Sequence, residues 1–177
     1  MNYAKIKHFD IANGEGVRIS LFVSGCQFHC EDCFNSETWN YDYGKLYTQE
    51  TENELVRLIS NPNIDGLSIL GGDPLWQNEN GLQMLISLVN KIHSMNKTIW
   101  IWSGFTWEQI FSQTITDDPG HIKFFRQVLI KNCDVFIDGQ FETDKRDLKL
   151  KWRGSYNQRV IDVKKTLEQK EIVLWNG

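Results

Sequence analysis

Short apolar runs and longer amphipathic stretches alternate along most of the chain. The apolar runs are typical of buried strands and lie at 17–23, 66–70, 98–102 and 133–137. Apolar residues at helical spacing predict helices over 51–61, beginning with a capping box at 51–54, over 82–92, over 106–111 with Thr106 as cap, and over 124–129. Because strand and helix alternate, the pattern favours a parallel sheet.

The two ends of the chain and two polar segments complete this picture. Residues 3–12 alternate loosely and predict an edge strand, and residues 172–175 predict a closing strand. Asp162 is placed to cap a short helix. Residues 35–47 predict an irregular cover over the loop after the first buried strand, and residues 142–152 predict a solvated loop.

The length of the chain limits the architecture that these elements can form. With 177 residues the chain has enough material for one sizeable core, and we expect residues 1–177 to form a single domain. A complete eight-stranded barrel usually needs about 250 residues. We therefore expect an α/β fold, a partial (β/α) barrel of about five or six parallel strands, with a flavodoxin-like doubly wound sheet as the alternative.

Composition and charge exclude several classes of partner. The formal net charge of -4 offers no basic footprint for nucleic acid. No apolar stretch approaches the roughly 20 residues of a membrane helix. The segment that begins at Met1 lacks the apolar region of a signal peptide. We expect a cytoplasmic protein with no nucleic-acid or membrane partner.

The most informative stretch is the loop at 24–35, which follows the first buried strand. It holds Cys26, Cys30 and Cys33 in a C-x3-C-x2-C spacing, at the strand edge where α/β proteins bind ligands. Soft thiolates select zinc or iron–sulfur clusters. An ordinary [4Fe–4S] cluster takes four cysteines, so three would leave one iron free to bind a small molecule.

Other interpretations of these cysteines stay open. Cys26, His29, Cys30 and Cys33 are the ligand set of a structural zinc site, although His29 and Cys30 are adjacent and zinc pairs usually stand two to four residues apart. A disulfide cluster is disfavoured by the odd number of cysteines and by the lack of a secretory signal. The remaining cysteine, Cys133, is interpreted as a packing residue.

A second motif, Gly71-Gly72-Asp73-Pro74, follows the next buried strand. Alone it indicates only a tight strand-to-helix turn. At the same edge as the cysteines, however, its carbonyl groups and Asp73 are placed to accept hydrogen bonds from an ammonium group, and glycine permits a close backbone approach.

The cysteine spacing resembles the radical S-adenosylmethionine (SAM) signature, and the chain as a whole resembles the anaerobic ribonucleoside-triphosphate reductase activating proteins. The resemblance covers most of the chain. It rests on Asn13, Gly14, Gly16, Arg18, the run Leu21–Cys26, His29, Cys30, the run Cys33–Ser36, Thr38, Trp39, the run Gly71–Leu75, Trp102, Gly104, Asp138, Gly139, the run Trp152–Ser155, Asn157 and Gln158.

This resemblance implies a function and a set of site residues. Cys26, Cys30 and Cys33 would hold [4Fe–4S], and SAM would chelate its fourth iron. The SAM contacts would be Asp32, Cys33, Phe34, Gly71, Gly72 and Asp73, with Arg153 and Asn157 at the rim or against a partner. A flavodoxin or ferredoxin would supply the electron. Cleavage of SAM would give a 5′-deoxyadenosyl radical, which would take a hydrogen atom from a glycine of the large reductase subunit.

The chain departs from the family pattern at several positions. Glu15 stands where the family usually has proline, Asp32 stands where it has glycine, and the tail at 163–177 is longer than in many members. Alternatives to this function are another small radical SAM enzyme, such as a different glycyl-radical activase or a 7-carboxy-7-deazaguanine synthase, or a zinc-stabilised binding module without catalysis.

Overall fold

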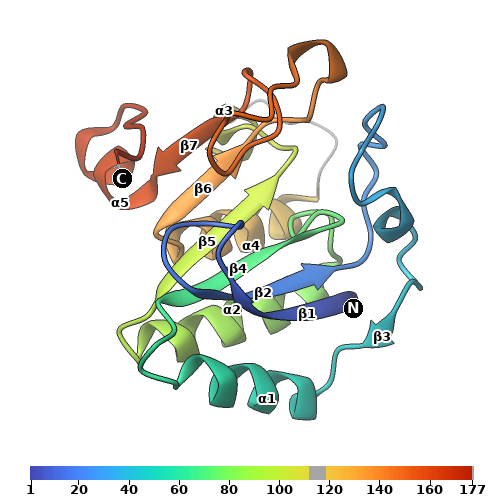
Figure 1. The fold of residues 1–177 in the computed structure, drawn as a ribbon, viewed down its shortest axis with the longest axis vertical. Coiled ribbons are helices and arrows are strands. Elements are labelled where there is room, and N and C mark those ends of the chain that lie inside the picture. The colour runs from blue at the N-terminus through green and yellow to red at the C-terminus, as the bar shows by residue number, and fades with distance from the viewer. Residues whose placement is uncertain (112–118, 177) are drawn as a thin grey trace.

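A mixed β-sheet forms the centre of the structure (Figure 1). The computed structural model describes residues 1–111 and 119–176, so Gly177 at the end of the predicted tail lies outside it. Within the described residues the sheet has seven strands in the order β3-β1-β2-β4-β5-β6-β7. They are β1 (Asn2–Asp10), β2 (Arg18–Val23), β3 (Lys45–Leu46), β4 (Gly66–Gly71), β5 (Thr98–Ser103), β6 (Val135–Asp138) and β7 (Arg159–Asp162).

The neighbouring strands β2, β4, β5 and β6 are parallel, so all four end at the same edge of the sheet. At that edge Val23 pairs with Gly71, and Ser103 pairs with Asp138. The strands β1, β3 and β7 join the sheet antiparallel. The expected five or six parallel strands are therefore corrected to four.

The connections explain this difference. Parallel neighbours need a crossover of about a dozen residues or more, usually with a helix. The segment 11–17 between β1 and β2 is too short for one. The longer segment 139–158 between β6 and β7 contains only a 3-10 turn, and it brings the chain back antiparallel from the same edge.

The helices begin at residues that the sequence partly identified. They are α1 (Gln49–Ile59), α2 (Glu79–His93), α3 (Trp107–Phe111), α4 (Gly120–Lys131) and α5 (Val163–Gln169), with the 3-10 turns η1 (Ser36–Trp39) and η2 (Thr143–Lys145). Asp162 caps α5 as predicted, since its side chain accepts from the Lys165 backbone N–H at 2.9 Å. The capping box of α1 begins at Thr48 instead of Thr51, which is its third helical residue. None of the helices in the described ranges is long and apolar enough to cross a membrane.

The two faces of the sheet have different neighbours. Alternate side chains such as Ile99 and Ile101 of β5 pack in the large core shared with α1, α2 and α4, which cover one face in Figure 1. On the opposite face Trp100 packs with Val135 and Ile137 in a second, smaller cluster. Since the helices cover one face only, the second face is left for the loops that rise from the strand ends.

The buried guanidinium of Arg18 closes the other end of this second face. Its Nε donates to Ser68 Oγ at 2.7 Å, and its Nη atoms donate to oxygens that include Thr98 Oγ1 and Leu67 O, at 2.9 and 2.8 Å. The group also lies 5.4 Å from the Trp100 ring. Burial lowers the pKa of Arg18 to about 10, so it remains charged at neutral pH.

The tail after α5 returns along β7. The Asp162 and Trp175 N–H groups donate to Val173 O and Val160 O at 2.9 and 2.8 Å, respectively. Only a single bridge, between Ile161 and Leu174, forms there, so the predicted closing strand is reduced to one bridge.

Asp10 joins the end of β1 to β2 from a fully buried position. Its carboxylate accepts from Lys7 Nζ at 2.8 Å, Asn13 Nδ2 at 2.6 Å, Ser20 Oγ at 2.7 Å and the Ala12 N–H at 3.0 Å. Burial alone would raise the pKa of Asp10, but these hydrogen bonds together lower it to about 2. A carboxylate whose pKa is lowered by folding stabilises the native state wherever it is ionised.

We predict that Asp10→Asn lowers the free energy of unfolding near neutral pH by about 1–3 kcal/mol, because charge-assisted hydrogen bonds are lost. The unfolded-state pKa of aspartate is about 3.9, so the difference between wild type and variant should be complete above about pH 5 and should shrink as the pH falls toward about 2. Urea unfolding at several pH values measures it. A difference that does not change with pH would contradict this role for Asp10.

Candidate functional site

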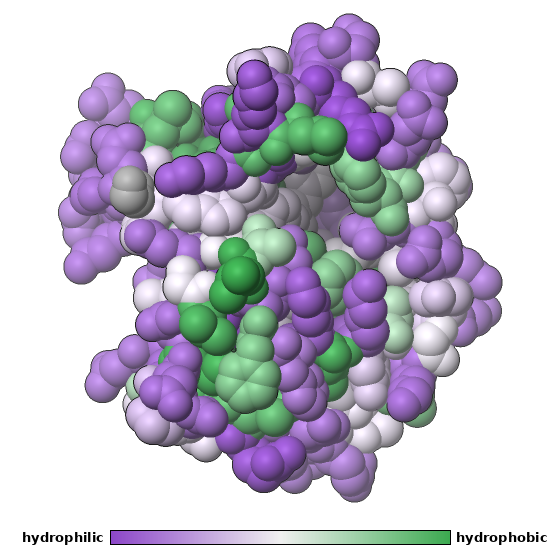
Figure 2. All heavy atoms as spheres, viewed as in Figure 1, coloured by the Kyte–Doolittle hydropathy of each residue, from purple (hydrophilic) through white to green (hydrophobic). Residues whose placement is uncertain are grey.

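A cavity of about 600 Å³ opens at the edge where the four parallel strands end. Figure 2 shows this face hollowed between the upper loops and the centre, with hydrophobic residues on either side. The lining combines thiols, strand-end residues and aromatic rings, namely Cys26, Cys30, Cys33, Gly71, Gly72, Asp73, Ser103, Gly104, Gly139, Phe28, Phe34, Trp39, Trp102, Phe141 and Trp152, together with other side chains of the segment 139–158.

The loop that follows β2 brings the three cysteines to this cavity. Cys26 is buried, and Cys30 and Cys33 are half-buried. The loop has no regular structure before η1, and its turns use the left-handed backbone of His29 and Asp32, with φ of 49° and 55°. Burial, reinforced by the negative charge of Asp73, raises the pKa of the Cys26 thiol to about 12. A metal that binds there must therefore displace a proton.

The donors present are three thiols on one cavity, and soft thiolates are the ligands that iron–sulfur clusters take. In a [4Fe–4S] cluster each thiolate ligates a different iron. His29, the fourth ligand of the zinc alternative, is exposed, and its ring lies 4.6 Å from that of Trp39.

Cys133 does not belong to the site. It is buried in the core on the helix side of the sheet, and its Sγ donates to Leu129 O at 3.2 Å. The prediction that this residue serves packing is confirmed.

The turn after β4 supports the cysteine loop from below. The Asp73 N–H donates to Gly25 O at 2.7 Å, and the Gly72 N–H donates to Val23 O at 2.8 Å. A Cβ on Gly72 would lie 2.5 Å from Gly25 O and 2.8 Å from Thr38 O. Glycine is needed at position 72 because the backbone of the cysteine segment passes directly over it.

The Asp73 carboxylate fixes the ends of β4 and β5 together. It is buried, and it accepts from the Leu75 N–H at 2.8 Å, from Ser103 Oγ at 2.9 Å and from the Gly104 N–H at 2.7 Å. Burial raises the pKa of Asp73 to about 6, against the opposing effect of these hydrogen bonds. Because its oxygens already accept hydrogen bonds from the protein, its main role in this fold is to hold the ends of β4 and β5 together beneath the cavity.

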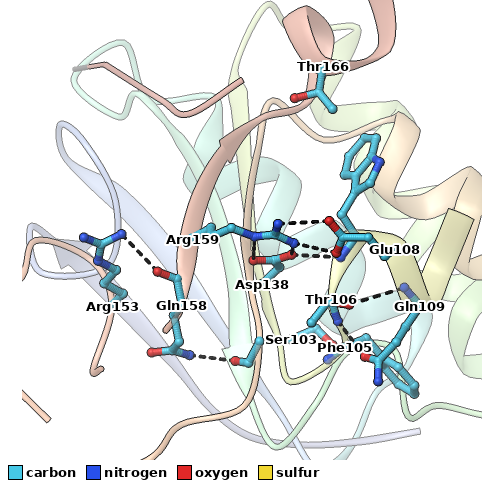
Figure 3. Close-up of polar contacts among 12 residues, drawn as sticks. Ser103, Phe105, Thr106, Glu108, Gln109, Asp138, Arg153, Gln158, Arg159 and Thr166 are labelled. Atoms are coloured by element: carbon cyan, nitrogen blue, oxygen red, sulfur yellow. Dashed lines mark hydrogen bonds and ion pairs between the residues drawn. The ribbon is translucent and has the colours of Figure 1, made fainter. Parts of the chain in front are cut away.

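The segment 139–158 forms the wall opposite the cysteines. Gln158 organises it, because its Nε2 donates to Gly139 O at 2.9 Å and its Oε1 accepts from the Gly154 N–H at 2.8 Å. Trp102 Nε1 donates to Trp152 O at 2.7 Å. Arg153 lies beside Gln158 in Figure 3, and its Nη1 donates to Gln158 O at 3.0 Å.

The ends of this segment are tied to α3 by a charged network (Figure 3). Arg159 Nε donates to Asp138 Oδ1 at 3.0 Å, and Arg159 Nη1 donates to Glu108 Oε1 at 3.0 Å. Asp138 also accepts from the Trp107 N–H at 2.8 Å. These contacts raise the pKa of Arg159 above its ordinary value, so the cation persists at all physiological pH values.

Most of the predicted site residues meet at the cavity. Cys26, Cys30, Cys33, Phe34, Gly71, Gly72, Asp73 and Arg153 line it. Asp32 is exposed and is not part of the lining. Its left-handed backbone explains why glycine suits this position, and aspartate is among the side chains that tolerate it. Asn157 also lies outside the lining and donates to Gln140 O at 2.7 Å.

The sequence did not identify the residues of the segment 139–158 that form a wall of the cavity. The segment 142–152 was expected to be a solvated loop, but Leu148, Leu150 and Trp152 line the cavity. The chain forms a turn and bends over 148–152, with Trp152 at a φ of 63°, so no strand or helix periodicity marks these three residues as neighbours of one cavity. Phe28 was also missed as a lining residue.

The chain is similar to known proteins over most of its length. Residues 12–161 match the model of a 4Fe-4S single cluster domain. An anaerobic ribonucleoside-triphosphate reductase-activating protein of Enterobacteria phage T4 is 41% identical over 90% of this chain and 93% of its own length. Proteins of the same name from Vibrio cholerae and Escherichia coli K12 are 36% and 32% identical, over 89% and 90% of this chain and 96% and 97% of their own lengths.

We predict that Gly72→Ala displaces the cysteine loop, because the new methyl group would collide with backbone atoms that cannot move independently. Overpacking of this kind costs about 1–3 kcal/mol of unfolding free energy. Chemical denaturation measures the loss, and circular dichroism checks that the variant is folded. Gly120→Ala is the matched control, since a Cβ there meets nothing within 4 Å. Equal stability of the two variants would contradict the close approach at Gly72.

Proposed function

Because the chain belongs to the anaerobic ribonucleoside-triphosphate reductase-activating proteins, we propose that it is an enzyme that activates such a reductase by reductive cleavage of SAM, leaving a glycyl radical on the reductase. The observation that supports this most is the set of three cysteines on one cavity, with the remaining cysteine buried on the far side of the sheet. Three thiolates on a [4Fe–4S] cluster leave one iron for a ligand that is not protein.

The chain's own residues divide the work of holding the cofactors. Cys26, Cys30 and Cys33 would ligate three irons of the cluster. When bound, the cluster supplies the electron that cleaves SAM, and the cleavage leads to removal of a hydrogen atom from a glycine of the reductase. The lining is otherwise mostly apolar, and Asp73 and Arg153 are its charged members among the described residues, so the cavity would exclude water from a reactive step.

SAM would lie between the cysteine loop and the strand ends. The backbone of Asp32, Cys33 and Phe34 and the carbonyl groups of Gly71 and Gly72 are the proposed contacts. The glycines permit the close approach that such contacts require. Asp73 would contribute mainly by fixing the ends of β4 and β5, since its carboxylate is held by Ser103 and the Gly104 N–H.

The mouth of the cavity is the proposed entry for the glycine-bearing segment of the large reductase subunit. Phe34 and Leu148 line the cavity, yet they are 60% and 80% exposed. Exposed apolar side chains of this kind are typical of surfaces that bind a partner. Arg153 would contribute to the rim, and Asn157 would support it through Gln140.

Residues 1–177 would form one radical SAM domain, in which the mixed sheet serves as a partial barrel with the site on its uncovered face. A flavodoxin or ferredoxin would supply the electron to the cluster.

We predict that Cys30→Ala abolishes both the cluster's response to SAM and SAM cleavage. Loss of a residue that only supports a metal ligand typically costs 10–100-fold, so loss of a ligand should exceed about a hundredfold. The test is anaerobic reconstitution, reduction, and electron paramagnetic resonance with and without SAM, followed by assay of methionine release. Cys133→Ala is the matched control and should retain the signal. Wild-type turnover in Cys30→Ala, or zinc in place of iron, would refute the proposed function.

We also predict that Leu148→Asp impairs formation of the glycyl radical on the reductase without impairing the cleavage of SAM. An exposed leucine of a partner surface contributes about 1–3 kcal/mol when it is buried, so the yield of glycyl radical should fall roughly tenfold or more at limiting reductase. Methionine release in the absence of reductase should be unchanged, because the substitution leaves the proposed SAM contacts intact. Equal losses in both assays would place Leu148 against SAM instead of the partner.

A further inference from the structure

The half of the cysteine loop that carries Cys30 and Cys33 has few attachments to the rest of the protein. The first half is well anchored, since the Cys26 N–H donates to Trp39 O at 3.1 Å and the Phe28 ring packs 4.9 Å from that of Phe105. In the second half the Cys33 N–H donates to Cys30 O at 3.2 Å, within the loop itself.

Residues 30–34 reach the rest of the described chain through one segment, Phe141–Arg146, here called the strap. Thr143 Oγ1 donates to Glu31 O at 2.8 Å. The Phe34 ring lies 5.7 Å from the Phe141 ring, and the Arg146 guanidinium lies 4.7 Å from the Phe34 ring. Within the described residues, no other segment beyond 24–39 makes a hydrogen bond or a ring contact with residues 30–34.

The strap has its own support on the wall of the cavity. The Glu142 N–H donates to Ser155 Oγ at 3.2 Å, and the Tyr156 N–H donates to Lys145 O at 3.0 Å. Its side chains are half-buried or exposed and lie outside both hydrophobic cores. Because the strap adds little to the cores, its contacts with the cysteine loop can be changed without unfolding the protein.

We propose that Phe141, Thr143 and Arg146 are positioning residues, which hold Cys30, Cys33 and Phe34 in the arrangement that cluster and SAM binding require. This inference rests on the proposed function for its consequence in the reaction. The contacts between the strap and the cysteine loop do not depend on the proposed function, since the strap holds the loop whether or not a cluster is present. The left-handed turns at His29 and Asp32 make the loop prone to rearrange when the strap is lost.

The first arm of the test uses the full chain without metal. Thr143→Val removes the hydroxyl donor while keeping the side-chain shape, and Arg146→Met removes the cation while keeping an apolar stem. Iodoacetamide alkylation of each cysteine is followed by mass spectrometry. Loss of one hydrogen bond or one cation–π contact should speed the alkylation of Cys30 and Cys33 roughly threefold to tenfold, and the double variant should exceed either single variant.

Matched controls accompany these variants. Thr143→Ser keeps the hydroxyl and should behave as wild type. Arg57→Met changes an exposed arginine on α1, far from the cavity, and should have no effect. Cys133 serves as an internal reference whose rate stays constant in every variant.

The second arm uses the reconstituted protein. Thr143→Val and Arg146→Met should raise the KM for SAM by a factor similar to the alkylation effect, with a smaller change in kcat, and should speed the removal of iron by a chelator. A strap that serves only stability would change thermal unfolding and leave KM and iron release as in wild type.

The outcomes separate the two proposals. If the variants leave the alkylation rates of Cys30 and Cys33 unchanged, the proposal that the strap holds the cysteine loop would be overturned, even if wild type cleaves SAM. Faster alkylation with unchanged KM and iron release would overturn its positioning role. Wild type that binds no cluster would refute the proposed function, and the positioning role would be overturned with it.

Discussion

The close contact between the cysteine loop and the end of β4 is the constraint on which the site depends. The Asp73 N–H donates a hydrogen bond to Gly25 O at 2.7 Å. Because Gly72 has no Cβ, the backbone of the loop can pack in direct contact with it. The Asp73 carboxylate extends this contact to β5 through Ser103 and Gly104. Three chain segments are thus fixed relative to one another at the cavity, by contacts within the protein itself.

The one-sided packing of the sheet makes room for this arrangement. The helices α1, α2 and α4 bury one face, so the fold is stabilised by the large core on that side. The second face is free to carry a site. Arg18 and Trp100 close its lower end, and the cysteine loop and the segment 139–158 form its walls. The large core and the cavity therefore draw on different faces of the same strands.

Glu15 and the C-terminal tail, which the resemblance led us to expect as departures from the family pattern, meet in space. Trp175, in the longer tail, donates from Nε1 to Glu15 Oε2 at 3.2 Å, and its ring lies 5.7 Å from that of Trp100. The tail thus covers the lower end of the second face, beside Glu15. The contact links sequence positions 160 residues apart, so nothing in the local pattern of either segment could indicate it.

The sequence by itself determined the elements and the chemistry. Continuous apolar runs located the four parallel strands, and helical spacing located most helices, because burial on both faces and the helical period each leave a local pattern. The three cysteines and Gly71-Gly72 were recognisable because the site needs those residue types close together in the chain. Only the tertiary structure decided the number of parallel strands, the commitment of Asp73 to protein donors, and the wall and strap formed by 139–158. These features depend on contacts between segments that are distant in sequence. The local sequence does not indicate which distant group will form a hydrogen bond with a buried polar atom.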